Sequence, residues 1–215
     1  MTKEKIILVG GGGHCRSVID VIETENRYEI IGILDREELI GQKVLSYSII
    51  ASDNDIETVF KTCQNFLITV GHIKSSAVRE KLFNSIKEKG GQFPVIISPR
   101  AHVSKHACLS EGTVVMHHAL VNTLAMTGKN CIINTGAVLE HDVQVGDHCH
   151  ISTGAYINGE CKVGNGSFVG SNATIVQTIH VGERNVIAAG AVVTKNTENF
   201  SLYTGNPATL KKKLH

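Results

Sequence analysis

Aliphatic residues recur at every sixth position through the second half of the chain. Counting from Val103, fifteen of sixteen such positions hold Val, Leu or Ile, and Thr127 is the exception. A period of six is neither the 3.6 of a helix nor the simple alternation of a strand. It is typical of a coil with flat faces, in which each six-residue unit forms one short strand and one corner. The pattern therefore predicts a parallel β-helix of about five coils rather than a β-sandwich.

Small residues accompany this repeat. The position two before each aliphatic residue is usually Ala, Cys, Ser or Thr, which allows a tight corner. The position just after is often glycine, and there we expect positive φ angles, as at Gly128, Gly146, Gly164, Gly170 and Gly182. Aromatic residues make up 5% of the chain and Trp is absent. A core without large aromatic rings should be narrow and repetitive.

The first part of the chain has a different pattern. In order, it predicts a strand over residues 5–9, a helix over 16–25, strands over 29–34 and 66–70, and a helix over 74–89. This order favours a small parallel βαβ sheet. Pro94 and Pro99 then mark a stiff connector. We therefore expect an α/β module over residues 1–93 and an all-β domain over 98–215.

Three loops of this module should meet at one edge, because ligands of parallel sheets bind beyond the carboxyl ends of the strands. These loops are residues 10–14, Asp35 with Arg36, and Gly71 with His72. Four glycines at a helix start favour a phosphate-bearing or polar ligand. A dinucleotide site, with Asp35 on a ribose, and a purely structural turn remain open, since Cys15 occupies the third glycine position of the dinucleotide pattern. His14 would contact the ligand or bond to the helix start.

Composition excludes several classes of protein. Lys plus Arg number 21 and Asp plus Glu number 20, so the net charge is +1, and we expect no binding to nucleic acid or to acidic membranes. No apolar run approaches the roughly 18–20 residues that span a bilayer. The N-terminus predicts no export signal, so we expect a cytoplasmic protein. The six cysteines form no CxxC pair, which favours buried thiols over disulfides or a metal framework.

The repeat over residues 98–194, with the tail sequence Gly-Asn-Pro-Ala at 205–208, resembles the left-handed β-helix of the hexapeptide-repeat acyltransferases. Joined to a Gly-Gly-x-Gly-His-type loop, it is similar to bacterial sugar acetyltransferases. These are the amino-sugar-nucleotide enzymes of bacillosamine and perosamine type and the sialic acid O-acetyltransferases. The resemblance implies a left-handed β-helix, acetyl-CoA as co-substrate, no metal, a homotrimer, and a role in bacterial surface-glycan biosynthesis.

The resemblance is strongest over residues 132–142, where Asn134 and Thr135 precede a hydrophobic stretch that ends in His141 and Asp142. It implies that His141 is the general base. An imidazole, with an unperturbed pKa of ~6.5, accepts the proton that an attacking amine or hydroxyl loses. Asp142 would orient the ring and stabilise its charged form. Glu140 is a secondary alternative for that role.

The resemblance assigns further roles by matching motif positions. His150 would contact acetyl-CoA near the thioester, and Asn134 would contact the sugar. Backbone groups at Gly159, Ser171 and Ala189 would bind the CoA arm, and Lys195 its phosphates. The lysines at 211–213 either share that task or form a solvated terminus. In the module, the residues expected to bind the acceptor are Gly12, Gly13, His14, Asp35, Arg36, Gly71 and His72.

These features favour N-acetylation of a nucleotide-linked amino sugar. O-acetylation of sialic acid is the nearest alternative, with Arg36 receiving the carboxylate. A different class is a zinc enzyme like the β-helix carbonic anhydrases, with ligands drawn from His117, His118, His141, His148 and His150. Of these, we expect His148 to be a surface corner residue. A non-catalytic β-helix used for assembly is a third possibility.

Overall fold

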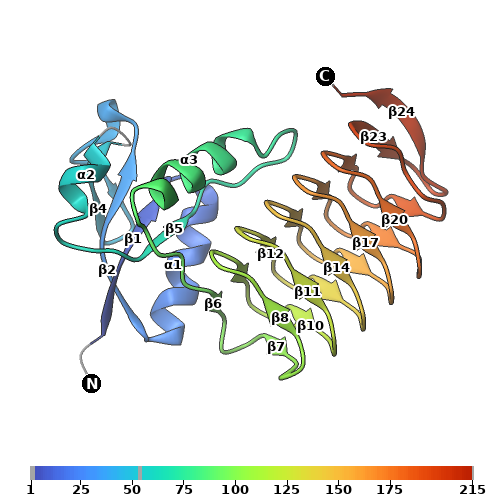
Figure 1. The fold of residues 1–215 in the computed structure, drawn as a ribbon, viewed down its shortest axis with the longest axis horizontal. Helices are drawn as coiled ribbons and strands as arrows, with labels where there is room; N and C mark the ends of the chain where they lie inside the picture. The colour runs from blue at the N-terminus through green and yellow to red at the C-terminus, as the bar shows by residue number, and fades with distance from the viewer. Residues whose placement is uncertain (1–2, 53–54, 215) are drawn as a thin grey trace.

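The computed structural model describes residues 3–52 and 55–214, which form an α/β module packed beside a stack of triangular coils (Figure 1). The module holds a five-stranded sheet in the order β3-β4-β2-β1-β5, parallel except for the β3–β4 pair. Its elements are β1 (Glu4–Val9), α1 (Gly13–Glu25), β2 (Tyr28–Asp35), η1 (Glu37–Leu39), β3 (Lys43–Val44), β4 (Tyr47–Ser52), α2 (Ile56–Val59), β5 (Phe66–Ile68) and α3 (Ala77–Glu88).

The expected parallel sheet is confirmed, with differences at its edges. The first helix begins at Gly13, three residues before the expected start, because the glycine loop enters the helix directly. Strands β3 and β4 and the short elements η1 and α2 were not predicted. Their segments are short and carry no helical period or flanking turn motif. They extend the sheet beyond β2.

The second part of the chain is a parallel β-helix, as expected from the six-residue repeat. Up to residue 193 its strands stack in register on three faces, and each coil advances eighteen residues, as in the pairing of Leu120 with Val138. The chain then ends in two strands that pair antiparallel with each other. Face A contains β7 (His102–Val103), β10 (Leu120–Val121), β13 (Val138–Leu139), β16 (Tyr156–Ile157), β19 (Thr174–Ile175) and β22 (Val192–Val193).

The other two faces complete the triangle. Face B contains β8 (Cys108–Leu109), β11 (Met126–Thr127), β14 (Gln144–Val145), β17 (Lys162–Val163) and β20 (His180–Val181). Face C contains β6 (Ile96–Ile97), β9 (Val114–Val115), β12 (Ile132–Ile133), β15 (His150–Ile151), β18 (Phe168–Val169), β21 (Val186–Ile187), β23 (Ser201–Thr204) and β24 (Thr209–Lys213). The aliphatic residue of each repeat points inward, and these residues form one continuous core.

The corners correct one expectation about the glycines. Left-handed backbone recurs every sixth residue, at Gly112, His118, Leu124, Asn130, Gly136, Asp142, His148, Gly154, Glu160, Gly166, Asn172, Thr178, Arg184 and Gly190. The glycines expected to supply positive φ lie two residues earlier and do not have it. A Cβ on Gly164 would lie 2.6 Å from the backbone nitrogen of Glu183. These glycines are needed because the next coil stacks directly on them.

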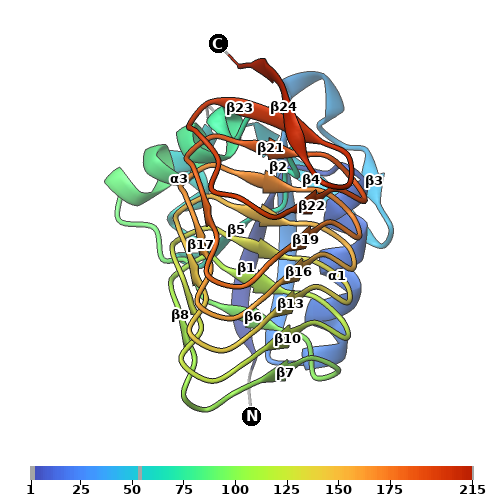
Figure 2. The same cartoon turned by 90° about the vertical axis from the view of Figure 1, so that its right-hand side faces the viewer.

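The module covers face C of the coils, on the far side of the stack in Figure 2. Outward-facing Val114 and Ile132 share a core with Val18 and Ile22 of α1. His117 adds a polar link, because its Nε2 lies 2.7 Å from Asp20 of α1 and its Nδ1 lies 2.5 Å from the Ser98 hydroxyl. The two parts therefore share one apolar interface.

Two further features concern the surface. Five cysteines are buried, but Cys108 is exposed, because it points outward from β8. Lys211, Lys212 and Lys213 lie exposed on β24, and the Lys213 ammonium pairs with Glu198. Within residues 3–52 and 55–214, none of the helices has the length and apolarity that crossing a membrane requires.

Candidate active site

His141 and Asp142 form the corner that joins face A to face B, directly after β13. His141 Nδ1 lies 2.9 Å from Asp142 Oδ2, and the two side chains are 56% and 47% exposed. The hydrogen bond to Asp142 is the main cause that raises the pKa of His141, and the charges of Asp142, Glu140 and Glu160 add to it. An Nδ1–H bond to the carboxylate leaves the lone pair on Nε2 free to accept a proton.

Glu140 has a different task from Asp142. Its Oε2 accepts a hydrogen bond of 2.8 Å from the side-chain amide of Asn122, one coil earlier. The carboxylate is therefore held along the corner instead of at the ring nitrogen of His141. Of the two acids, Asp142 is the one that contacts the imidazole.

Gly159 lies one coil beyond His141 on the same edge. A Cβ at this glycine would lie 2.6 Å from both Cε1 and Nε2 of His141. The ring therefore rests on the bare backbone of Gly159. A side chain at this position would have to displace the exposed imidazole, so the glycine lets the ring lie where it does.

The remaining residues expected to bind CoA divide between two edges. Gly159 and Lys195 lie on the edge between faces A and B, at steps of eighteen residues from His141. Ser171 and Ala189 follow β18 and β21 and lie on the edge between faces C and A. The Ser171 hydroxyl lies 3.1 Å from that of Ser152. The two groups therefore flank face A on opposite sides, the face turned toward the viewer in Figure 2.

Four of the other expected residues meet at the interface between module and coils. His150 Nδ1 donates to the His72 carbonyl at 2.8 Å, and His150 Nε2 lies 3.1 Å from the Asn134 amide nitrogen. The ring of His150 is 5.6 Å from that of His72 and 6.3 Å from that of His14. We call His14, His72, His150 and Asn134 the interface cluster. It lies on face C, opposite the His141 edge.

The imidazoles of the interface cluster are held uncharged. Burial is the largest cause, and it lowers the pKa of His14 and of His72 to about 3 and that of His150 to about 4. The positive charge of Arg79 lowers all three further, while the backbone near Ser167 partly opposes this for His72. Nε2 of His14 and both ring nitrogens of His72 are buried without a hydrogen-bond partner of good geometry among the described residues. These nitrogens are enclosed by protein, with less than 1 Å² of each atom exposed.

Arg79 is the residue that sequence reasoning missed. It is 0% exposed and contacts both the end of β5 and the coil corner at Asn130. A signal was present, because Arg79, Leu82, Phe83 and Ile86 follow the spacing of a buried helical stripe. An arginine in that stripe needs buried acceptors for its charge.

Asp35 and Arg36 follow one another at the end of β2, but their side chains make different contacts. One carboxylate oxygen of Asp35 accepts from the Gly11 nitrogen at 2.6 Å, and the other from the Arg36 nitrogen at 2.8 Å. Asp35 thus holds the loop in shape. The exposed Arg36 side chain pairs with Glu38 at 3.1 Å and lines a cavity of 460 Å³ at the ends of β2 and β4.

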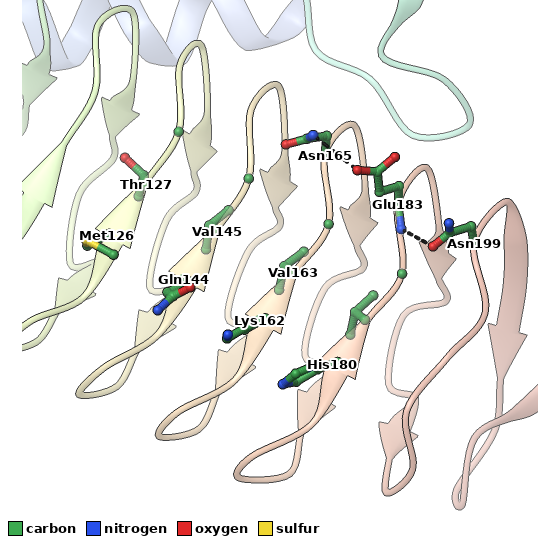
Figure 3. Close-up of a pocket in the computed structure, with 15 residues that line it drawn as sticks. Met126, Thr127, Gln144, Val145, Lys162, Val163, Asn165, His180, Glu183 and Asn199 are labelled. Atoms are coloured by element: carbon green, nitrogen blue, oxygen red, sulfur yellow. Dashed lines mark hydrogen bonds between the residues drawn. The ribbon is translucent and has the colours of Figure 1, made fainter.

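A second hollow lies on face B and contains none of the expected site residues. This groove of 480 Å³ runs across the coils, with Gln144, Lys162 and His180 pointing outward (Figure 3). Its rim is a ladder in which each side-chain oxygen accepts from the backbone nitrogen one coil earlier, as between Asn165 and Asp147 at 2.8 Å. The ladder provides hydrogen-bond acceptors for backbone N–H groups at the corners, and each of these bonds joins one coil to the next.

The zinc alternative gains no support. Among residues 3–52 and 55–214, no group of three or more His, Cys, Asp or Glu side chains is arranged to hold a metal ion. His148, expected on the surface, is half-buried, bonds to Asn130 at 3.0 Å and packs its ring 5.5 Å from that of Phe83. His117 is engaged by Asp20.

Family models match both parts of the chain. Residues 5–86 match the PglD N-terminal domain, and residues 125–159 and 160–195 match the bacterial transferase hexapeptide of six repeats. The first match spans the α/β module, and the second spans most of the coils.

Solved structures match along almost the whole chain. The acetyltransferase domain of PglB from Neisseria gonorrhoeae FA1090, in complex with acetyl coenzyme A, is 27% identical with a TM-score of 0.91, covering 97% of this chain and 100% of that one. A histidine-to-alanine variant of GDP-perosamine N-acetyltransferase from Caulobacter crescentus, in complex with CoA and GDP-perosamine, is 26% identical with a TM-score of 0.92 and covers 99% of each chain. WeeI from Acinetobacter baumannii AYE shares the fold at 21% identity and a TM-score of 0.78.

Proposed function

The chain is a hexapeptide-repeat transferase with a PglD-type N-terminal domain, and we propose that it transfers the acetyl group of acetyl-CoA to the amino group of a nucleotide-linked amino sugar in bacterial surface-glycan biosynthesis. The observation that carries the proposal is the His141–Asp142 corner. An exposed imidazole with Nδ1 held by a carboxylate and an unbonded lone pair on Nε2 is suited to general-base catalysis. Similar proteins bind acetyl-CoA and GDP-perosamine, which supports the two substrates.

In the proposed reaction, the amine nitrogen of the sugar attacks the thioester carbonyl carbon. His141 Nε2 accepts the proton that the amine loses as the new C–N bond forms. The carbon–sulfur bond then breaks, and the imidazolium returns the proton to the departing thiolate. Asp142 stabilises the transient positive charge on the ring. The products are the N-acetylated sugar and CoA.

The complete site in this proposal takes more than one chain. The interface cluster lies on face C, whereas His141 lies on the opposite edge, and this separation supports a cleft between neighbouring subunits. We propose a homotrimer, in which the module of one subunit presents the acceptor to His141 of the next. Acetyl-CoA would lie in the same cleft, near Gly159 and Lys195 of one chain and Ser171 and Ala189 of another. The shared use of acetyl-CoA and sugar nucleotides favours the cytoplasm.

The acceptor-binding roles of the module follow from this arrangement. Gly12, Gly13 and the start of α1 offer backbone N–H groups to a diphosphate. We assign His14, His72 and Asn134 to the sugar, and Arg36 to the cavity at the ends of β2 and β4. Binding of GDP-perosamine by a similar protein favours the amine acceptor over sialic acid.

The test is an acetyl-transfer assay with acetyl-CoA and a panel of UDP-, GDP- and dTDP-linked amino sugars, with sialic acid as the hydroxyl acceptor. Thiol release and product mass are measured. The replacement His141→Ala should lower kcat by about 10²–10⁴-fold with little change in CoA affinity, because it removes the base alone. His106→Ala, at an exposed corner two coils earlier, is the matched control. Unchanged turnover in the His141 variant would remove the base assignment.

A further inference from the structure

Arg79 is a fully buried arginine in the first turn of α3. Its guanidinium donates through Nη1 to the carbonyls of Ile68, at 3.1 Å, and Val70. Through Nη2 it donates to Asn130, at 2.7 Å to the backbone oxygen and 2.6 Å to the side-chain oxygen. The planar fork of arginine suits such a set of acceptors, which an ammonium group cannot match.

These four acceptors belong to parts of the molecule that are distant in sequence. Ile68 and Val70 lie at the carboxyl end of β5, just before Gly71 and His72. Asn130 is a left-handed corner of the β-helix, with φ of 53°. Arg79 therefore clamps the segment 70–72 onto the coils. The clamp is continued by His150, which donates to the carbonyl of His72.

The charge of Arg79 has an effect beyond the clamp. Within the described part of the chain, no carboxylate lies at ion-pair distance from this guanidinium, so backbone and amide oxygens alone offset it. The ionisable groups that face it and the interface cluster are His148 and His150 from the coils and the Cys131 thiol. A nearby positive charge disfavours imidazolium. Arg79 thus helps to keep His14, His72 and His150 uncharged.

We propose that Arg79 is a positioning residue for the acceptor: by clamping segment 70–72 onto the Asn130 corner, it fixes the loop that carries His72 and lies against His14, where the acceptor binds. The proposal rests on the acetyltransferase function proposed above. Gly71 lies beside His14, since a Cβ built on this glycine would be in ordinary contact with that of His14, at 3.6 Å. Segment 70–72 therefore carries His72 itself and borders His14.

The first test separates acceptor binding from chemistry. In Arg79→Met, the KM for the best nucleotide-linked amino sugar should rise at least tenfold, whereas kcat and the KM for acetyl-CoA should stay within about threefold. Arg79→Lys should restore only part of the acceptor affinity, because one ammonium cannot reach all four oxygens. Thermal unfolding verifies that each variant is folded. If Arg79→Met does not fold, Asn130→Gly, which keeps the left-handed corner but loses one acceptor, takes its place. An unchanged acceptor KM in a folded variant overturns the proposal.

The second test needs no turnover, so it stands even if the proposed function fails. In Arg79→Met, the positive charge beside the interface cluster is removed and no new charge is introduced. Histidine NMR titration should then show higher pKa values for His14, His72 and His150 than in the wild type, with His141 unchanged. Identical titrations of the interface cluster in both proteins would show that Arg79 does not control it. Absence of acetyl transfer by the wild type would contradict the proposed function instead.

Discussion

At the scale of single residues, the chemistry of His141 depends on two neighbours with opposite properties. Asp142 supplies a carboxylate at 2.9 Å, and Gly159 supplies empty space beneath the ring. The first sets the tautomer and raises the pKa of the imidazole. The second lets the ring rest against the next coil. The first contact is between neighbours in the chain, whereas the second arises because residues eighteen apart stack at an edge of the β-helix.

The raised pKa of His141 predicts a pH profile. A base must be neutral to accept a proton, so the rate should fall as the pH drops through a value above 6.5. In Asp142→Asn, the bond that favours the charged ring is lost, and the acidic limb of kcat should move to lower pH. The plateau rate should also fall, because the ring is oriented less well. An acidic limb that does not move would show that another group titrates.

Gly159→Ala tests the packing of the ring. The added methyl group must displace the imidazole, since it would lie 2.6 Å from Nε2. We expect kcat to fall by about 10- to 100-fold, the scale of a misplaced catalytic group, with little change in melting temperature. Lys105→Ala, an exposed position on the same edge two coils before His141, serves as the control and should keep full activity. Equal activity of the two variants would contradict the role of Gly159.

Some residue roles were visible in the sequence and others were not. The positions of His141 and Asp142 on a corner follow from counting repeats. The burial of His150 does not, because an outward position on a coil is exposed unless another part of the chain covers it. Arg79 was missed for the same reason, since its acceptor Asn130 lies 51 residues away.

At the scale of elements, the same stabilising contacts recur in each coil, every eighteen residues. Inward Val, Leu and Ile form the core, and small residues fill the corners. At some positions only glycine fits, because the backbone of the next coil occupies the place of a Cβ. Gly164, for example, packs against Gly182 and Glu183. The expected strands of the coils were confirmed because each unit is specified locally. Strand β3 was missed because two residues outside a repeat carry no pattern, and β4 because its only β-branched residues, Ile49 and Ile50, stand between serines.

Gly164→Ala should therefore destabilise the coils. The new methyl group would lie 2.6 Å from the Glu183 nitrogen and 2.7 Å from the Gly182 carbonyl carbon, and backbone cannot move aside cheaply. We expect the free energy of unfolding to fall by roughly 1–3 kcal/mol, the usual cost of overpacking. Lys162→Ala, an exposed outward position on β17, should change it by less than about 0.5 kcal/mol. Chemical denaturation measures both.

At the scale of the whole molecule, the module and the coils share a core. Ile132 is 0% exposed, although it points outward from face C, because α1 covers it. The substitution Ile132→Ala should lower the free energy of unfolding by about 2–4 kcal/mol. Val138→Ala, the matching outward position on uncovered face A, should cost much less.

The same interface predicts that the two parts unfold together. Circular dichroism at 222 nm reports helices α1 and α3 of the module, and hydrogen exchange reports the coils. In the wild type both probes should give one transition at the same denaturant concentration. Two separate transitions would show that the shared core does not couple the parts.

The sequence by itself determined the three-faced coil, the parallel module and the corner that carries His141, because a repeat and a βαβ order are encoded in neighbouring residues. Only the tertiary structure decided which coil face the module covers, and that covering buries His150, joins His14 and His72 to Asn134, and gives Arg79 its acceptors. Those outcomes depend on contacts between segments far apart in the chain. No local pattern specifies such contacts, because burial of an outward side chain depends on what packs against it.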